Sequence, residues 1–269
     1  GSSTIAMPPG WNLAAGKASE EVAVERLPGW VSAMPMAGYG YDWSGARDLM
    51  VLPHNAMRRE VMDLEKIVRS MRARASRGAI EYEMPAIKAW WAEFAAFVKM
   101  YLNYEVSLFF PWVRSGAEME APQLVAVKER GQEVRSCWDT CATAMEEYCT
   151  TPSIAHFDAF VAAVDQLART SQAYFVEQEE NLTPVIEASF TPRDAAKVER
   201  ALCKQAIATS KLNPVILARW MENPTKYRDW VRKNFTGAER IQYASWNRLF
   251  IQTHLRTMLE FHCKSGEAT

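Results

Sequence analysis

Apolar residues recur at alternating steps of three and four over several long stretches of this chain, and this spacing restricts the fold more than any other feature. The clearest example lies between residues 90 and 113, where the stripe consists of Trp90, Phe94, Phe97, Tyr101, Tyr104 and Leu108. The spacing places these side chains on one face of an α-helix, which buries that face against other helices. No segment has the alternation of a β-strand, so the sequence predicts an all-α protein.

Four long helices are predicted between residues 44 and 190. Their approximate ranges are 44–74, 85 to 111–116, 121–149 and 153–189. Pro85 suits a first helical turn and Ser153 is a typical capping residue, whereas Pro184 is expected to kink the fourth helix or to end it early. Long helices with short connections form an up-down-up-down four-helix bundle, which we expect over residues 44–190.

The flanking segments have different patterns. Residues 1–43 are interrupted by prolines and glycines and contain several tryptophans, which predicts an irregular N-terminal strap with a short helix near residues 19–26. Residues 191–269 are expected to form a C-terminal helical extension packed on the bundle. Its predicted helices comprise about 192–211, 213–222, 224–234 and 237–262.

Composition excludes several classes of function. The 31 basic and 32 acidic residues nearly cancel, so there is no electrostatic case for binding nucleic acid or an anionic membrane surface. No run approaches the roughly 18 apolar residues of a membrane span. Five cysteines without a Cys-x-x-Cys pair are expected to be buried hydrophobes in a soluble protein of a reducing compartment. Gly1-Ser2-Ser3 resembles a cloning remnant, so a targeting peptide could have been removed, and the organelle and oligomeric state are not determined.

Small or polar residues interrupt each of the four stripes near its middle. These residues are His54, Tyr101, Glu105, Gly131, Tyr174 and Gln178. Because the midpoints of antiparallel helices lie at similar heights, we expect them to converge on one layer of the bundle, with space beside Gly131. A core-facing carboxylate is costly unless it is paired, hydrogen-bonded or bound to a cation, so Glu105 marks the candidate site. In contrast, His254 and His262 are expected on the solvent-facing side of the last helix.

Three motifs carry these residues. They are Leu52-Pro53-His54-Asn55-Ala56-Met57-Arg58-Arg59-Glu60, Tyr101-x-x-x-Glu105 with Leu108-Phe109-Phe110-Pro111, and Tyr174-x-x-x-Gln178-Glu179-Glu180 with Leu182-Thr183-Pro184. Together they make residues 45–190 similar to the hemerythrin-like (HHE cation-binding) family. The resemblance implies a four-helix bundle around a di-iron centre, with His54 and Glu105 as remaining ligands and Glu179 as a candidate second carboxylate. Tyr101, Tyr174 and Gly131 stand where the family has histidines.

These departures predict that the di-iron, oxygen-carrying centre has been lost, because one imidazole and two carboxylates support two irons poorly. We therefore expect no metal cofactor, and a polar core pocket for a small-molecule ligand or an acid/base reaction. The pocket candidates are Glu105, His54, Tyr101, Tyr174 and Gln178. In an enzyme, Glu105 would be the general acid or base with His54 as its partner, and the two tyrosines would be orienting donors.

Two alternatives remain open at the level of sequence. In the first, iron or manganese binds a site built from His54, Glu105 and Glu179. In the second, the chain is a structural or interaction protein that uses its C-terminal helices, in which Trp220, Trp230 and Trp246 lie. The sequence does not establish whether the protein is an enzyme.

Overall fold

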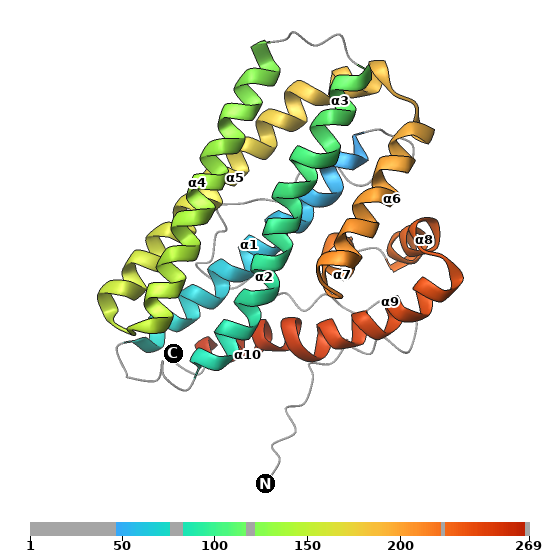
Figure 1. Ribbon diagram of the computed structural model, residues 1–269. Coiled ribbons are helices and arrows are strands. Elements are labelled where there is room, and N and C mark those ends of the chain that lie inside the picture. The colour runs from blue at the N-terminus through green and yellow to red at the C-terminus, as the bar shows by residue number, and fades with distance from the viewer. Residues whose placement is uncertain (1–46, 76–82, 117–121, 222–223, 267–269) are drawn as a thin grey trace. The chain divides into compact units, whose positions relative to one another are not determined.

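The computed structural model describes residues 47–75, 83–116, 122–221 and 224–266. These ranges contain helices and no β-strand, so the prediction of an all-α protein is confirmed. All of the described helices belong to one compact unit within residues 33–269 (Figure 1). The predicted strap at residues 1–43, with its short helix, lies outside the described residues.

The long helices predicted from the stripes are present. They are α1 (Asp48–Ala75), α2 (Met84–Tyr104), α4 (Pro122–Thr150) and α5 (Ile154–Ser189). α2 continues directly through a π-helical turn, η3 (Glu105–Phe109), into α3 (Phe110–Gly116). The side chain of Ser153 caps α5, as its position predicts. Pro184 lies inside α5, which continues to Ser189, so this proline does not end the helix early.

The apolar stripe of α2 is buried against its neighbours. α5 makes its most extensive contacts with α4 and also contacts α1, while α2 contacts both α1 and α4; α4 and α5 lie side by side at the left of Figure 1. Trp90, Phe94 and Phe97 are almost fully buried. Leu108, which the stripe predicts as buried, is partly exposed, and Phe109 is buried instead. The reason is that a π-helical turn contains one more residue than an α-helical turn and rotates the following residues.

The C-terminal region is also helical. Its elements are α6 (Pro192–Thr209), α7 (Asn213–Ala218), α8 (Pro224–Asn234), α9 (Gly237–Phe250), the π-helical turn η4 (Ile251–Leu255) and α10 (Arg256–Gly266). α6 packs on α2, whereas α7 and α10 pack on α1. Buried Glu199 of α6 accepts a hydrogen bond from the indole Nε1 of Trp230 at 2.9 Å, which anchors α8 on α6. The predicted extension therefore contacts the long helices directly.

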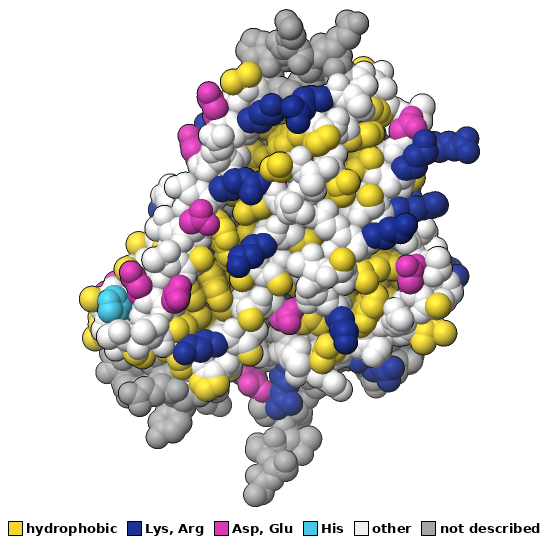
Figure 2. All heavy atoms as spheres, in the orientation of Figure 1, with side chains coloured by type: hydrophobic (Ala, Val, Ile, Leu, Met, Phe, Trp, Pro, Cys, Tyr) yellow, Lys and Arg dark blue, Asp and Glu magenta, His cyan; other side chains and the backbone are white. Residues whose placement is uncertain are grey.

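The surface carries both signs of charge. On the face in Figure 2, lysine and arginine side chains are interspersed with acidic side chains and apolar patches. This distribution agrees with the formal net charge of −1. In the described ranges, none of the helices combines the length and the apolar character that crossing a membrane requires.

Candidate functional site

Glu105 is the centre of a buried hydrogen-bond network. It is the first residue of η3, and its Oε1 accepts three hydrogen bonds: from the Tyr101 hydroxyl at 2.7 Å, the Tyr174 hydroxyl at 2.8 Å and Gln178 Nε2 at 2.7 Å. All four side chains are at most 2% exposed. The structure thus brings together four of the residues selected from the sequence, two from the α2–η3 helix and two from α5.

The protonation states of this network follow from its burial. Burial raises the pKa of the Glu105 carboxyl, and hydrogen bonds from Tyr101, Gln178 and Tyr174, together with the nearby His54, only partly offset this effect. Burial, and then the Glu105 charge, raise the pKa of Tyr101 and Tyr174 well above the usual value. Both tyrosines therefore remain neutral donors at physiological pH, and Glu105 is the group in the network that is shifted toward accepting a proton.

His54 belongs to a neighbouring ionic cluster. Its Nδ1 lies 2.8 Å from Glu179 Oε1, and Arg58 contacts the same carboxylate with Nη1 at 2.8 Å from Oε1 and Nη2 at 3.1 Å from Oε2. Arg58 is fully buried, and Asn55 and Gln172 accept its remaining hydrogen bonds. Burial alone would raise the pKa of Glu179, but the hydrogen bond and charge of His54 and those of Arg58 prevail and lower it to about 2.

The two clusters share one layer of the core. The His54 ring meets the Tyr101 ring edge-on, with 6.0 Å between centroids, and stacks on Phe175 at 4.5 Å. The same phenylalanine lies beneath the Arg58 guanidinium at 5.2 Å. Arg58 was not selected from the sequence as a site residue. The available signal was its position four residues after His54, one helical turn along the same face of α1.

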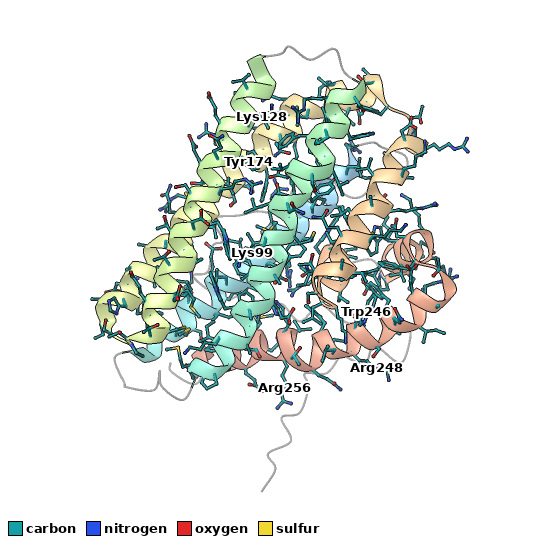
Figure 3. The ribbon with its side chains drawn as sticks, viewed as in Figure 1. Lys99, Lys128, Tyr174, Trp246, Arg248 and Arg256 are labelled. Carbon is teal, nitrogen blue, oxygen red and sulfur yellow. The ribbon has the colours of Figure 1, made fainter. Side chains whose placement is uncertain are left out.

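Gly131 of α4 accommodates a neighbouring side chain rather than an open space. A Cβ at this position would lie 2.9 Å from the hydroxyl oxygen and 3.3 Å from Cζ of Tyr174, so even alanine would force a displacement. Figure 3 labels Tyr174. The Tyr174 phenol therefore fills the space that the sequence led us to expect beside Gly131. The glycine allows this tyrosine to reach Glu105 from α5.

The donor set does not fit the di-iron centre that the family resemblance implies. Within residues 47–266 as described, no group of three or more His, Cys, Asp or Glu side chains is arranged to hold a metal ion. His54 and Arg58 both contact the Glu179 carboxylate, while Glu105 Oε1 is occupied by neutral donors. Tyrosine ligates a metal well as phenolate, and the raised pKa of Tyr101 disfavours that form.

A second buried ionic cluster joins α1 to the C-terminal region. His254 Nε2 lies 2.7 Å from Glu60 Oε2, and Arg219 Nη1 lies 3.0 Å from Glu60 Oε1. Arg219 also donates a hydrogen bond to Asp63 Oδ2. Burial would raise the pKa of Asp63, but the charge of Arg219, with those of Arg59 and Lys66, lowers it. The cluster thereby connects His254 and Glu60, which are 194 residues apart in the sequence.

The prediction that His254 faces solvent is wrong. The imidazole is buried and stacks on the Trp90 indole, with ring centroids 4.7 Å apart and planes inclined by 15°. Its Nε2 is directed to Glu60, and its Nδ1 has no hydrogen-bond partner among the described residues. The His262 side chain lies outside the described residues.

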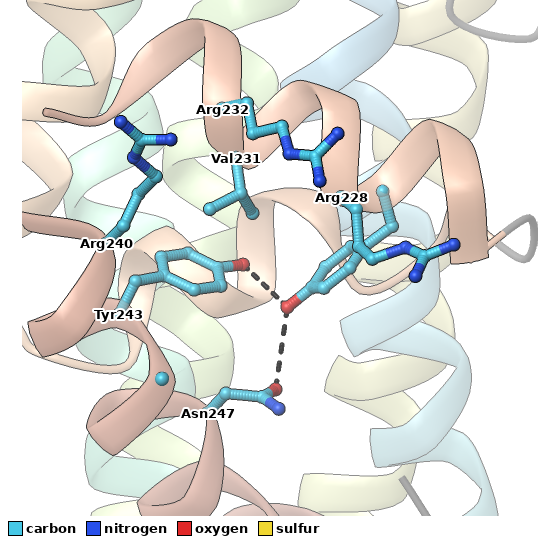
Figure 4. Close-up of a pocket in the computed structure, with 8 residues that line it drawn as sticks. Arg228, Val231, Arg232, Arg240, Tyr243 and Asn247 are labelled. Carbon is cyan, nitrogen blue, oxygen red and sulfur yellow. Dashed lines mark hydrogen bonds between the residues drawn. The ribbon is translucent and has the colours of Figure 1, made fainter. Parts of the chain in front are cut away.

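Two surface depressions are lined by residues other than those of the Glu105 network. One, of about 300 Å³, lies between α8 and α9 and is lined by residues of those helices (Figure 4). The other, of about 350 Å³, lies over α2 and α4. In the second, Arg135 donates a hydrogen bond to the backbone carbonyl of Leu102, one turn before η3.

The core therefore contains two carboxyl groups in opposite environments. Glu105 is surrounded by neutral donors and has a raised pKa, whereas Glu179 is held by Arg58 and His54 and has a lowered pKa. Carboxyl groups with shifted pKa values are found both at catalytic sites and in structural ion-pair networks. The residues that contact each carboxyl indicate which role it has. Comparisons of the chain with protein-family models, curated proteins and solved structures found no match.

Proposed function

We propose that the chain is a divergent hemerythrin-like protein in which α1, α2, α4 and α5 form the family's four-helix bundle. In this proposal a hydrogen-bonded polar core replaces the di-iron centre, and the protein acts by binding through its C-terminal helices, which form a pocket between α8 and α9. The observation that carries the proposal is the convergence of three neutral donors, from Tyr101, Tyr174 and Gln178, on one oxygen of Glu105. The two tyrosines stand at positions where the family resemblance implies metal-binding histidines.

The energetics of the core support this proposal. A buried carboxylate is stabilised by converging hydrogen bonds or by a bidentate guanidinium, and both arrangements are present, at Glu105 and at Glu179. The contacts connect α1 with α5 through Arg58, and the α2–η3 helix with α5 through Glu105. Side chains thereby make the cross-links between helices that ligands to a shared metal would otherwise make.

A second candidate function is acid/base chemistry or small-molecule binding at Glu105. It is favoured by the raised pKa of this carboxyl and by the Oε1 atom of Gln178, which is buried without a hydrogen-bond partner among the described residues. In that role Glu105 would exchange the proton, with His54 beside it and Tyr101 and Tyr174 as orienting donors. The first proposal is preferred because Tyr174 fills the space beside Gly131.

Elemental analysis of protein purified without chelator tests the proposal. We expect no stoichiometric iron or manganese in the wild type, and we expect Glu105→Gln to change stability without abolishing the binding of a partner. Near-stoichiometric metal that is lost in His54→Ala would contradict the proposal and restore the metal alternative. Loss of a ligand or of an activity in Glu105→Gln, in protein that unfolds at the same urea concentration as the wild type, would instead favour the second candidate.

A further inference from the structure

The pocket between α8 and α9 has an apolar floor and a basic rim. Tyr227 and Val231 of α8 face Tyr243 and Ala244 of α9 across a volume of about 300 Å³ (Figure 4). This volume lies at the lower end of the range for small-molecule sites. The floor therefore suits a small ligand with an apolar or planar body.

Three arginines surround this floor. Arg228 and Arg232 lie one helical turn apart on α8, and Arg240 lies in the first turn of α9. The Arg228 guanidinium donates to the carbonyl of Pro224 at 3.2 Å, and that of Arg240 donates to the carbonyl of Thr236 at 3.4 Å. Both acceptors are neutral, so hydrogen bonding does not cancel either charge.

Carboxylates neutralise little of this positive charge. Arg232 Nη1 lies 3.4 Å from Asp229 Oδ1 in an exposed ion pair. Arg228 and Arg240 have no carboxylate within ion-pair distance in the part of the chain that the structure describes. Glu239, beside Arg240, instead accepts the backbone N–H of Thr236 at 2.7 Å as a helix cap. Two guanidinium groups are thus available to an incoming anion, and their planar fork matches carboxylate and phosphate oxygens.

The aromatic floor is held in place by its own polar groups. The hydroxyls of Tyr227 and Tyr243 lie 2.8 Å apart, and the Tyr227 hydroxyl also contacts Asn247 Oδ1 at 3.5 Å. Burial raises the pKa of Tyr227 to about 12, so this pair carries no negative charge that would oppose an anion. The ring centroids are 6.1 Å apart and the planes are inclined by 57°, and both tyrosines line the pocket.

We propose that this pocket binds a small organic anion, with its carboxylate or phosphate group at the rim formed by Arg228, Arg232 and Arg240 and a planar apolar body placed against Tyr227 and Tyr243. This inference names a ligand class for the C-terminal helices, and it rests on the proposed function in which these helices are the binding region. Carboxylate and phosphate share the chemistry that the arginines recognise, so the test uses both.

The test is a ligand-observed NMR titration of the full chain with phenyl phosphate, benzoate, inorganic phosphate and phenol. We expect phenyl phosphate or benzoate, or both, to bind saturably. Phenol lacks the anion and inorganic phosphate lacks the apolar body, so each should bind at least about tenfold more weakly. Hydrogen bonds to charged groups are worth roughly a tenfold to hundredfold change in affinity. Equal binding of phenol and phenyl phosphate, or no binding of either aromatic anion, would overturn the inference.

Variants of exposed residues locate the binding. Arg228→Gln and Arg240→Gln should each weaken binding of the aromatic anion by at least about tenfold, and Ala244→Phe should abolish it by filling the pocket. The matched control is Arg248→Gln, since Arg248 is an exposed arginine of the same helix α9 that does not line the pocket (Figure 3). An equal loss of affinity in the control would contradict the assignment to this pocket.

The outcomes separate this inference from the proposed function. Failure of the aromatic anions to bind refutes the ligand class, while the polar core is judged independently by metal content and by the Glu105→Gln variant. Stoichiometric metal in the wild type would refute the proposed function. The ligand titrations of Arg228→Gln and Arg240→Gln would still test the ligand class, because they do not depend on metal content.

Discussion

Glu179→Gln tests whether the ion pair with Arg58 stabilises the core. The pKa of Glu179 falls from an ordinary value of 4.5 to about 2, and at about 1.4 kcal/mol per pH unit this corresponds to about 3 kcal/mol of stability at neutral pH. The substitution also leaves the guanidinium of Arg58, which is fully buried, without its anion, a loss that typically costs about 3–5 kcal/mol. We therefore expect Glu179→Gln to lower the free energy of unfolding by about 3 kcal/mol at pH 7.

The pH dependence provides a second, independent criterion. Because the folded pKa of Glu179 is below its unfolded value, the stabilisation is present above pH 4.5 and is lost as the pH falls toward about 2. Urea unfolding followed by circular dichroism at pH 7, 4 and 3 should show the difference between wild type and variant shrinking, to about half near pH 3. The control is Glu180→Gln, which replaces the exposed neighbouring carboxylate and should change stability by less than about 0.5 kcal/mol. A difference that is constant from pH 7 to pH 3, or no larger than that of the control, would refute the argument.

Three further predictions concern the same core. Gly131→Ala would place a Cβ 2.9 Å from the Tyr174 hydroxyl and should lower the free energy of unfolding in urea by about 1–3 kcal/mol. His254→Phe keeps an aromatic ring but removes one of the two partners of Glu60, the imidazole at 2.7 Å, so it should destabilise the protein by about 1–3 kcal/mol in thermal or urea unfolding. The folded pKa of Glu105 is raised above 4.5, so its stabilisation is complete below that pH and is lost as the pH rises through the folded pKa. The wild type should therefore lose stability relative to Glu105→Gln between about pH 4.5 and neutrality, measured as urea midpoints.

The sequence predicts the long helices well because burying one face of a helix imposes the three/four spacing. The stripe of α2 from Trp90 to Tyr104 is almost fully buried, and Ser153 caps α5 as expected. Pro184 was expected to kink α5 or to end it early, and the early ending does not occur, because the helix continues to Ser189. Local propensity marks where a helix can weaken, but packing against α4 and α1 decides whether it ends.

Side-chain partners are harder to predict than helices because they depend on contacts between distant segments. The sequence selected Glu105 and Tyr174 from their core-facing positions, and they are hydrogen-bonded across 69 residues. It did not select Arg58, because an arginine in a helix is usually exposed and its burial depends on Glu179 of another helix. It also assigned His254 to the surface, since nothing near that residue in sequence indicates Glu60, its partner 194 residues away.

The π-helical turns lie where burial was predicted wrongly, at Leu108 in η3 and at His254 in η4. Glu105 opens η3 and His254 lies in η4, and π-helical turns are frequently found at functional sites. At η3 the Phe110 N–H bonds the Glu105 carbonyl five residues earlier, and the preceding Leu102 carbonyl accepts a side-chain hydrogen bond from Arg135. The three/four spacing applies only to a continuous α-helix, so it does not account for the additional residue in a π-helical turn. Arg135 belongs to α4, so the hydrogen bond to Leu102 is a tertiary contact. The geometry of the turn, and with it the position of the Glu105 carboxyl, therefore depends on contacts between helices.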